Sequence, residues 1–116
     1  MKIISVVIDS KNKNQIYKLL DKEIKLKLAF DKSVDILKRN PYSGKKVKRS
    51  LWPKKLIKEY QIDNLYRYDM IRKHPGWRLL YTLQGDSKVK ILVVVLDVLE
   101  HKKYDRLFKY WFLILY

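Results

Sequence analysis

Four side chains in the second half of the chain carry the functional groups that chemistry on a phosphodiester requires. They are Arg67, Arg78, His101 and Tyr104. Arginine presents a guanidinium fork that neutralises phosphate charge, and histidine titrates near neutral pH and can serve as a general base or acid. Tyrosine can donate a proton or stack on a base. Metal-free cleavage of RNA needs these groups, because the 2′-OH loses a proton, the phosphorane needs cations and the leaving oxygen needs a proton.

Each of these residues also has an ordinary structural interpretation. A histidine such as His101 is more often a surface or hydrogen-bonded residue, and arginines on neighbouring strands can simply form the solvated face of a sheet. Aromatic residues beside them are expected to pack in the core rather than to stack on bases. These aromatic residues are Tyr66, Tyr68, Trp77 and Tyr81. Composition alone therefore leaves both interpretations open.

The whole chain is strongly basic. It has 27 Lys and Arg against 12 Asp and Glu, a formal net charge of +15 over 116 residues. Such a charge costs self-repulsion in the free protein, so we expect a polyanionic partner, either nucleic acid or an acidic protein. Basic stretches are usually only solvated, but together with this excess they predict contact with a phosphate backbone. They contain Lys45, Lys46, Lys48, Arg49, Lys54, Lys55 and Lys58.

Several classes of protein are excluded by what the sequence lacks. It has no cysteine, so a disulfide framework, thiol catalysis and cysteine-ligated zinc are excluded. His74 and His101 do not have the spacing of common metal sites, so we expect neither metal nor cofactor. The apolar runs 3–8, 91–95 and 111–116 are too short for a signal peptide or for the ~20 residues of a membrane span. We therefore expect one cytoplasmic domain, residues 1–116, without a membrane partner.

The first third of the chain predicts a strand followed by helices. Residues 1–8 are rich in Ile and Val, and Asp9 and Asn12 can cap a following helix. Between about residues 13 and 39, apolar residues recur at steps of three and four, which predicts helical structure, and we expect Asp21 to divide it. The recurring residues are Ile16, Leu19, Leu20, Leu26, Phe30, Val34 and Leu37.

The remainder predicts an antiparallel meander. Asn40 precedes Pro41, which ends the helix. Residues 51–62 are compatible with a strand, a short helix or a loop, and we expect an irregular segment or an edge strand. Three strands are predicted, at 66–70, 77–83 and 89–99. The third is apolar at nearly every residue, so we expect a central strand covered on both faces, with helices on one side. A short helix is expected at 102–110.

Taken in order, these segments resemble the RelE/ParE superfamily of toxins from type II toxin–antitoxin modules, and the archaeal RelE-like branch in particular. The resemblance depends on NPYSGKKVK at 40–48, NLYRYD at 64–69, GWRLLYTL at 76–83 and LDVLEHKKYDRLF at 96–108. It implies an α+β fold in which an N-terminal strand and a helical hairpin pack on a twisted antiparallel sheet. The final WFLILY lies outside the pattern, and we expect it to fold back on the core or to cover a partner.

The resemblance also implies a function and partners. It implies a ribosome-dependent endoribonuclease that cuts mRNA by attack of the 2′-OH on the adjacent phosphate. A cognate acidic antitoxin would neutralise it in a hetero-oligomer. Arg78 matches the phosphate-binding arginine of the family, Arg67 a basic strand position and Tyr104 the tyrosine near the scissile phosphate. His101 stands where relatives carry a histidine or a basic residue, and Lys102 or Lys103 can replace the C-terminal arginine in binding RNA.

One position departs from the family pattern. Asp69 stands where the most active nucleases carry a second basic residue that acts as general base. A carboxylate that faces RNA repels it. Either Asp69 points to the other side of the sheet, or His101 performs the acid–base work, or the protein binds RNA without cutting it efficiently; we favour His101. The rival hypothesis is non-catalytic: a ParE-like topoisomerase inhibitor or a basic RNA-binding module.

Overall fold

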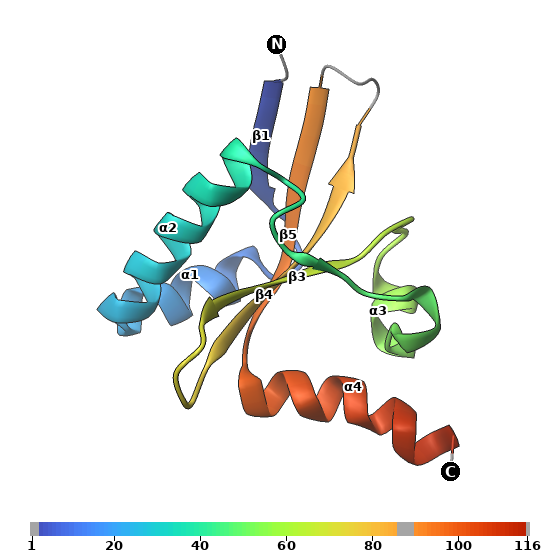
Figure 1. Ribbon diagram of the computed structural model, residues 1–116. Coiled ribbons are helices and arrows are strands. Elements are labelled where there is room, and N and C mark those ends of the chain that lie inside the picture. The colour runs from blue at the N-terminus through green and yellow to red at the C-terminus, as the bar shows by residue number, and fades with distance from the viewer. Residues whose placement is uncertain (1–2, 86–89, 116) are drawn as a thin grey trace.

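The computed structural model describes residues 3–85 and 90–115, with side chains up to residue 108. The helices pack around one sheet (Figure 1). In chain order the elements are β1 (Ile3–Ile8), α1 (Lys13–Lys22), α2 (Ile24–Arg39), β2 (Lys45–Lys46), the 3₁₀ turn η1 (Arg49–Leu51), α3 (Lys54–Glu59), β3 (Tyr66–Ile71), β4 (Trp77–Gln84), β5 (Lys90–Glu100) and α4 (His101–Leu115).

The five strands form a single sheet in the order β1-β5-β4-β3-β2. Strands β3, β4 and β5 are the antiparallel meander that the sequence predicts. Strand β1 runs parallel to β5, from Ile3 opposite Lys90 to Ile8 opposite Val95, so the sheet is mixed. A parallel pair needs a long crossover, and here every element from α1 to β4 lies between the two strands. The predicted α+β class is confirmed.

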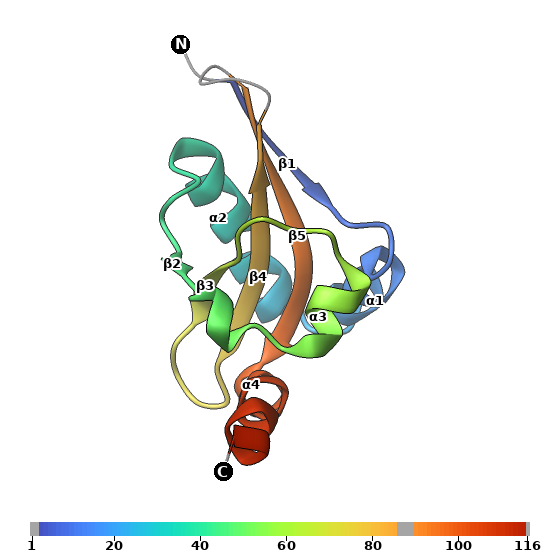
Figure 2. The same ribbon diagram turned by 90° about the vertical axis from the view of Figure 1, so that its right-hand side faces the viewer.

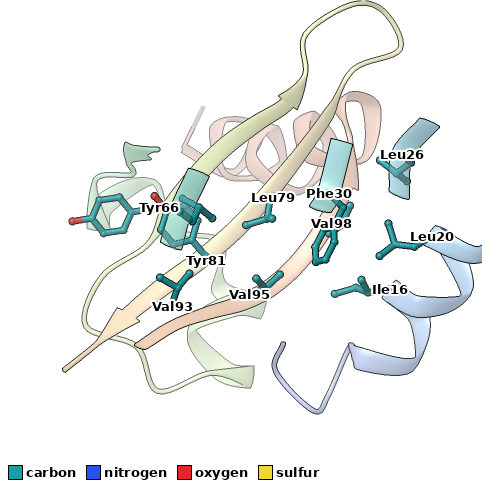
Figure 3. Packing of buried hydrophobic residues seen from close by; sticks show 11 residues of the cluster. Ile16, Leu20, Leu26, Phe30, Tyr66, Leu79, Tyr81, Val93, Val95 and Val98 are labelled. Atoms are coloured by element: carbon teal, nitrogen blue, oxygen red, sulfur yellow. The ribbon is translucent and has the colours of Figure 1, made fainter. Parts of the chain in front are cut away.

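One face of the sheet is covered by α1 and α2. Alternate residues of β4 and β5 point to this face, as the two-residue period of a strand requires, and the apolar stripes of both helices close over them (Figure 3). The buried side chains of this layer are Ile16, Leu20, Leu26, Phe30, Leu37, Tyr66, Leu79, Tyr81, Val93, Val95 and Val98. The predicted helical face is therefore confirmed, although the helices break at Glu23 and not at Asp21.

The start of α1 differs from its prediction. Asn12 occupies the N-cap position, but its side chain makes no capping hydrogen bond. Its Nδ2 donates instead to Tyr60 Oη at 2.8 Å and to the Leu96 carbonyl at 2.9 Å. Asp9 Oδ1 accepts from the Lys11 N–H at 2.9 Å. Asn12 thus joins the start of α1 to the end of α3 and to β5.

On the opposite face of the sheet, α3 lies over the strands and α4 packs at their lower end (Figure 2). Helices therefore lie on both sides of β5, whereas the sequence predicted them on one. The buried side chains of this layer are Trp52, Leu56, Tyr60, Leu65, Leu80, Val94, Leu96 and Tyr104. The expectation of an irregular segment or edge strand at 51–62 is wrong where residues 54–59 form the helix α3. Helix α3 buries Leu56, and Trp52 and Tyr60, which flank the helix on either side, are buried in the same layer.

Helix α4 begins immediately after β5 and is longer than the predicted 102–110. It crosses the lower end of the sheet and runs beyond it (Figure 1). The expectation that WFLILY folds back or covers a partner concerns side chains outside the described residues. Within 3–85 and 90–115, no helix has the length and apolar character needed to cross a membrane.

Candidate functional site

Strands β3 and β4 bring three charged side chains together on the face that carries α4. Arg67 and Asp69 are two residues apart on β3 and so share a face, and Asp69 lies directly opposite Arg78 of β4. Arg78 Nε is 3.2 Å from Asp69 Oδ1, and Arg67 Nε is 3.9 Å from the same oxygen. Asp69 therefore points to the same side as the arginines, and the alternative in which it faces away is excluded.

Tyr104, in the first turns of α4, lies under both guanidinium groups. Arg78 Cζ is 4.4 Å from the centre of its ring and Arg67 Cζ is 5.7 Å from it, distances typical of cation–π contacts. The ring of Phe108 stacks against Tyr104 at 4.2 Å and 21°. Only 6% of Tyr104 is exposed. In this arrangement Tyr104 serves as a platform for the arginines, and its ring cannot stack on a base while these contacts persist.

The charge cluster is only partly satisfied. With two guanidiniums and one carboxylate it carries a net charge of about +1, and its three side chains are 17% to 25% exposed. Within the described part of the chain, Arg67 Nε and Asp69 Oδ1 are buried and have no hydrogen-bond partner. The contacts to Asp69 are thus ion pairs rather than aligned hydrogen bonds. Such a cluster retains donors for an incoming anion.

A groove of about 450 Å³ leads away from this cluster, between β2 and α4. Strand β2 pairs with β3, and Lys45 lies opposite Arg67. The groove is lined by Lys45, Lys46, Val47, Lys48, Leu51, Arg67, Tyr104 and Phe108. Three of the predicted RNA-binding lysines therefore adjoin the arginine cluster. The apolar lining was missed in the sequence, because nothing in the local pattern shows that Leu51 and Phe108 line the same groove.

Strand β2 is held in place by Tyr81. The Tyr81 hydroxyl donates to the Pro41 carbonyl at 2.8 Å and accepts from the Gly44 N–H at 3.0 Å. Burial raises the pKa of Tyr81 to about 12, so the hydroxyl keeps its proton at neutral pH. The lysines that follow Gly44 thus have a fixed position relative to β3.

The other predicted RNA-binding residues lie apart from the groove lining. Arg49 lies over the Trp52 ring, 5.0 Å from its centre, and its Nη2 donates to the Asp63 carbonyl at 3.2 Å. Lys54 and Lys102 are exposed at the starts of α3 and α4. None of these three residues lines the groove that adjoins the arginine cluster.

Lys55 and Lys103 lie near Asp97 instead. Burial raises the pKa of Asp97, while the N–H of Val98 and the charges of Lys55 and Lys103 lower it in part. Lys103 also lines a separate groove of about 490 Å³ along α1. Two of the predicted lysines thus contribute to the fold near a half-buried carboxylate.

His101 is placed at the start of α4. Its backbone N–H donates to the Gly76 carbonyl at 2.9 Å, and Gly76 has the positive φ of 73° that favours glycine. The His101 side chain is 47% exposed, and its Nδ1 lies 3.0 Å from Asp105 Oδ2. Arg67 and Arg78 both contact Tyr104, whereas the His101 side chain pairs with Asp105. The four-residue spacing of His101 and Asp105 was a signal that sequence reasoning missed.

No family model matches the chain, and neither a curated protein nor a solved structure matches it. In residues 3–85 and 90–115, no group of three His, Cys, Asp or Glu side chains could hold a metal ion. The site offers two guanidiniums, three lysines and a histidine paired with a carboxylate, a set suited to binding phosphate and moving protons.

Proposed function

We propose that this protein is the toxin of a type II toxin–antitoxin module and acts as a ribosome-dependent mRNA endoribonuclease. The observation that carries the proposal is the arginine cluster: Arg67 and Arg78 converge over Tyr104 at the end of a lysine-lined groove. Two guanidiniums in fixed positions suit a phosphorane, whose charge develops in the transition state. The sequence resemblance to RelE-like toxins adds the substrate and the partner.

In the proposed reaction the 2′-oxygen of the RNA attacks the adjacent phosphorus. A P–O2′ bond forms and the P–O5′ bond breaks, leaving a 2′,3′-cyclic phosphate and a 5′-hydroxyl. Arg67 and Arg78 neutralise the phosphorane. A lysine ammonium of the groove gives a proton to the leaving oxygen.

His101 is the proposed base. A proton on Nδ1 is held by Asp105, 3.0 Å away, and this leaves Nε2 as the nitrogen that accepts a proton in neutral imidazole. The contacts of His101 do not reach the arginine cluster, so the RNA itself has to lie between the two. An mRNA held by the ribosome is ordered in advance, which reduces the entropic cost of that arrangement.

The groove also suits the proposed antitoxin. An acidic segment that lies along the lysines would cover the groove, compensate much of the positive charge and stabilise the folded toxin by mass action. A short acidic protein encoded next to this gene, able to form a complex with the chain, is the expected partner. If no protein encoded by a neighbouring gene binds this chain, the result counts against the toxin proposal.

The decisive experiment is cleavage of mRNA on translating ribosomes by the purified protein, with the 5′ ends mapped. We expect Arg78→Ala to lower the cleavage rate by about a hundredfold, the effect of removing one group that stabilises the developing charge. Arg39→Ala is the matched control, because Arg39 is exposed at the end of α2 on the opposite layer and carries the same charge. Equal cleavage by Arg78→Ala and wild type would show that the assigned site is wrong.

A second experiment separates the base from the phosphate site. We expect His101→Ala to lose cleavage and to retain RNA binding, because the histidine does not contact the arginine cluster. Asp105→Asn should reduce cleavage less, since it only loosens the orientation of the ring. Unchanged cleavage by His101→Ala would remove His101 from the mechanism.

Asp69 favours a second candidate function, a basic RNA-binding module that does not cut. Its carboxylate already neutralises part of the charge that a phosphorane would need. This candidate predicts that 5′ ends remain unchanged while the protein still crosslinks to RNA in cells. A ParE-like inhibitor predicts intact mRNA together with trapped DNA breaks.

A further inference from the structure

We propose that Asp69 is a positioning residue for the two phosphate-binding arginines and not a competitor for their substrate. The inference rests on the proposed function and deepens it. It starts from the geometry of the arginine cluster, in which a single oxygen, Asp69 Oδ1, lies 3.2 Å from Arg78 Nε and 3.9 Å from Arg67 Nε.

Without Asp69 the two guanidiniums would repel each other. Their Cζ atoms lie 4.4 and 5.7 Å from the centre of the same Tyr104 ring, so they are near neighbours in a partly buried environment. Screening by water is weak at such a site, and two uncompensated cations would separate toward solvent. The strand register places Asp69 directly opposite Arg78 and two residues from Arg67. One carboxylate thus compensates both cations at the position where they converge.

Because Asp69 pairs with the Nε atoms, the Nη groups at the ends of both arginines remain available to bind substrate. A guanidinium has five N–H donors, and four of them are on the two Nη atoms. Asp69 contacts Nε of each arginine, and its Oδ1 is buried within the cluster. A phosphate that approaches along the groove therefore meets Arg67, which lines it, without displacing the carboxylate from Nε. Asp69 and Tyr104 together restrict each arginine from two directions, which is the support a phosphate site requires.

The opposite model, in which Asp69 occupies the phosphate position, makes a different prediction. A competing carboxylate raises KM, so its removal would tighten RNA binding and increase cleavage. A positioning carboxylate leaves ground-state binding almost unchanged and acts on the transition state, because the correct arginine geometry matters most when charge develops. The two models therefore differ in the sign of the effect of Asp69→Asn.

The experiment compares wild type, Asp69→Asn and Asp35→Asn, the last being a matched control because Asp35 is exposed on α2. Two readouts are taken on the full chain. The first is kcat and KM for mRNA cleavage on ribosomes. The second is the ¹H–¹⁵N spectrum of the arginine Nε–H groups, in which Arg67 and Arg78 are assigned by substitution. A thermal melt of each variant shows that it is folded.

We expect Asp69→Asn to lower kcat by about tenfold with KM within about twofold, the size of one interaction with a charged group. We also expect the Arg67 and Arg78 Nε–H signals to move toward those of exposed arginines as the side chains leave the Tyr104 ring, and Asp35→Asn to change neither readout. Faster cleavage, tighter binding or unmoved arginine signals would overturn the proposal. If the wild type does not cleave, the nuclease function fails and the spectra alone decide the role of Asp69.

Discussion

Gly44 is the position where a single methyl group should have the largest effect on the groove. A Cβ built on Gly44 would lie 2.5 Å from the Arg67 carbonyl oxygen and 2.6 Å from the Tyr81 hydroxyl. Both distances are shorter than real Cβ contacts, and neither neighbour can yield easily. The carbonyl belongs to β3, and the hydroxyl is held by hydrogen bonds to Gly44 and Pro41. Gly44→Ala therefore forces β2 and its preceding turn away from β3.

The expected cost follows from these contacts. Overpacking of a well-packed site costs about 1–3 kcal/mol, and each lost hydrogen bond of Tyr81 adds about 1 kcal/mol. We therefore expect Gly44→Ala to lower the free energy of unfolding by about 3 kcal/mol. For a domain of this size 1 kcal/mol corresponds to about 4 °C, so Tm should fall by about 12 °C. Affinity for RNA should fall as well, because the lysines of β2 follow Gly44 directly.

The assay is urea unfolding combined with a double-mutant cycle. Tyr81→Phe removes the hydroxyl and with it one of the two close approaches. If the hydroxyl is the main obstacle, the double variant Gly44→Ala/Tyr81→Phe is less destabilised than the sum of the single variants. If the Arg67 carbonyl is the main obstacle, the effects add. A loss of less than about 1 kcal/mol in Gly44→Ala would refute the reasoning, since a close approach of the backbone would then not constrain β2.

Three further predictions concern stability. Asn64→Ala removes side-chain hydrogen bonds to Thr82 and to both the N–H and the carbonyl of Leu83. The free energy of unfolding, measured in urea, should therefore fall by about 2–3 kcal/mol, and a change below about 1 kcal/mol would contradict this. Burial raises the pKa of Asp97, so the folded protein binds this proton more tightly than the unfolded chain. The resulting stabilisation is present at acid pH and is lost as pH rises through the raised pKa. Asp97→Asn should therefore have a higher Tm than wild type at pH 7 and the same Tm at acid pH, and an equal difference at both pH values would refute it. Burial likewise raises the pKa of Tyr60 and Tyr81 to about 12 from 10.0 in the unfolded chain. The free energy of unfolding should therefore fall between pH 10 and 12, which alkaline unfolding curves would show.

The elements themselves were largely accessible from the sequence, because their signals are local. The stripe from Ile16 to Leu37 repeats with the helical period, and β5 is apolar on both faces because it lies between two layers. Where the local signal was mixed, the prediction failed. Helix α3 is only six residues long and buries Leu56 alone, too short a pattern to indicate a helix.

The sequence by itself determined the chemical content of the candidate site: a basic chain without cysteine, two strand arginines, a histidine and a tyrosine. Only the tertiary structure decided how these groups meet. The register of β3 on β4 places Asp69 opposite Arg78, and the path of α4 brings Tyr104 beneath both arginines while His101 pairs with Asp105. The physical reason is that side-chain periodicity is set by neighbouring residues, whereas strand register and helix docking depend on contacts between segments far apart in the chain.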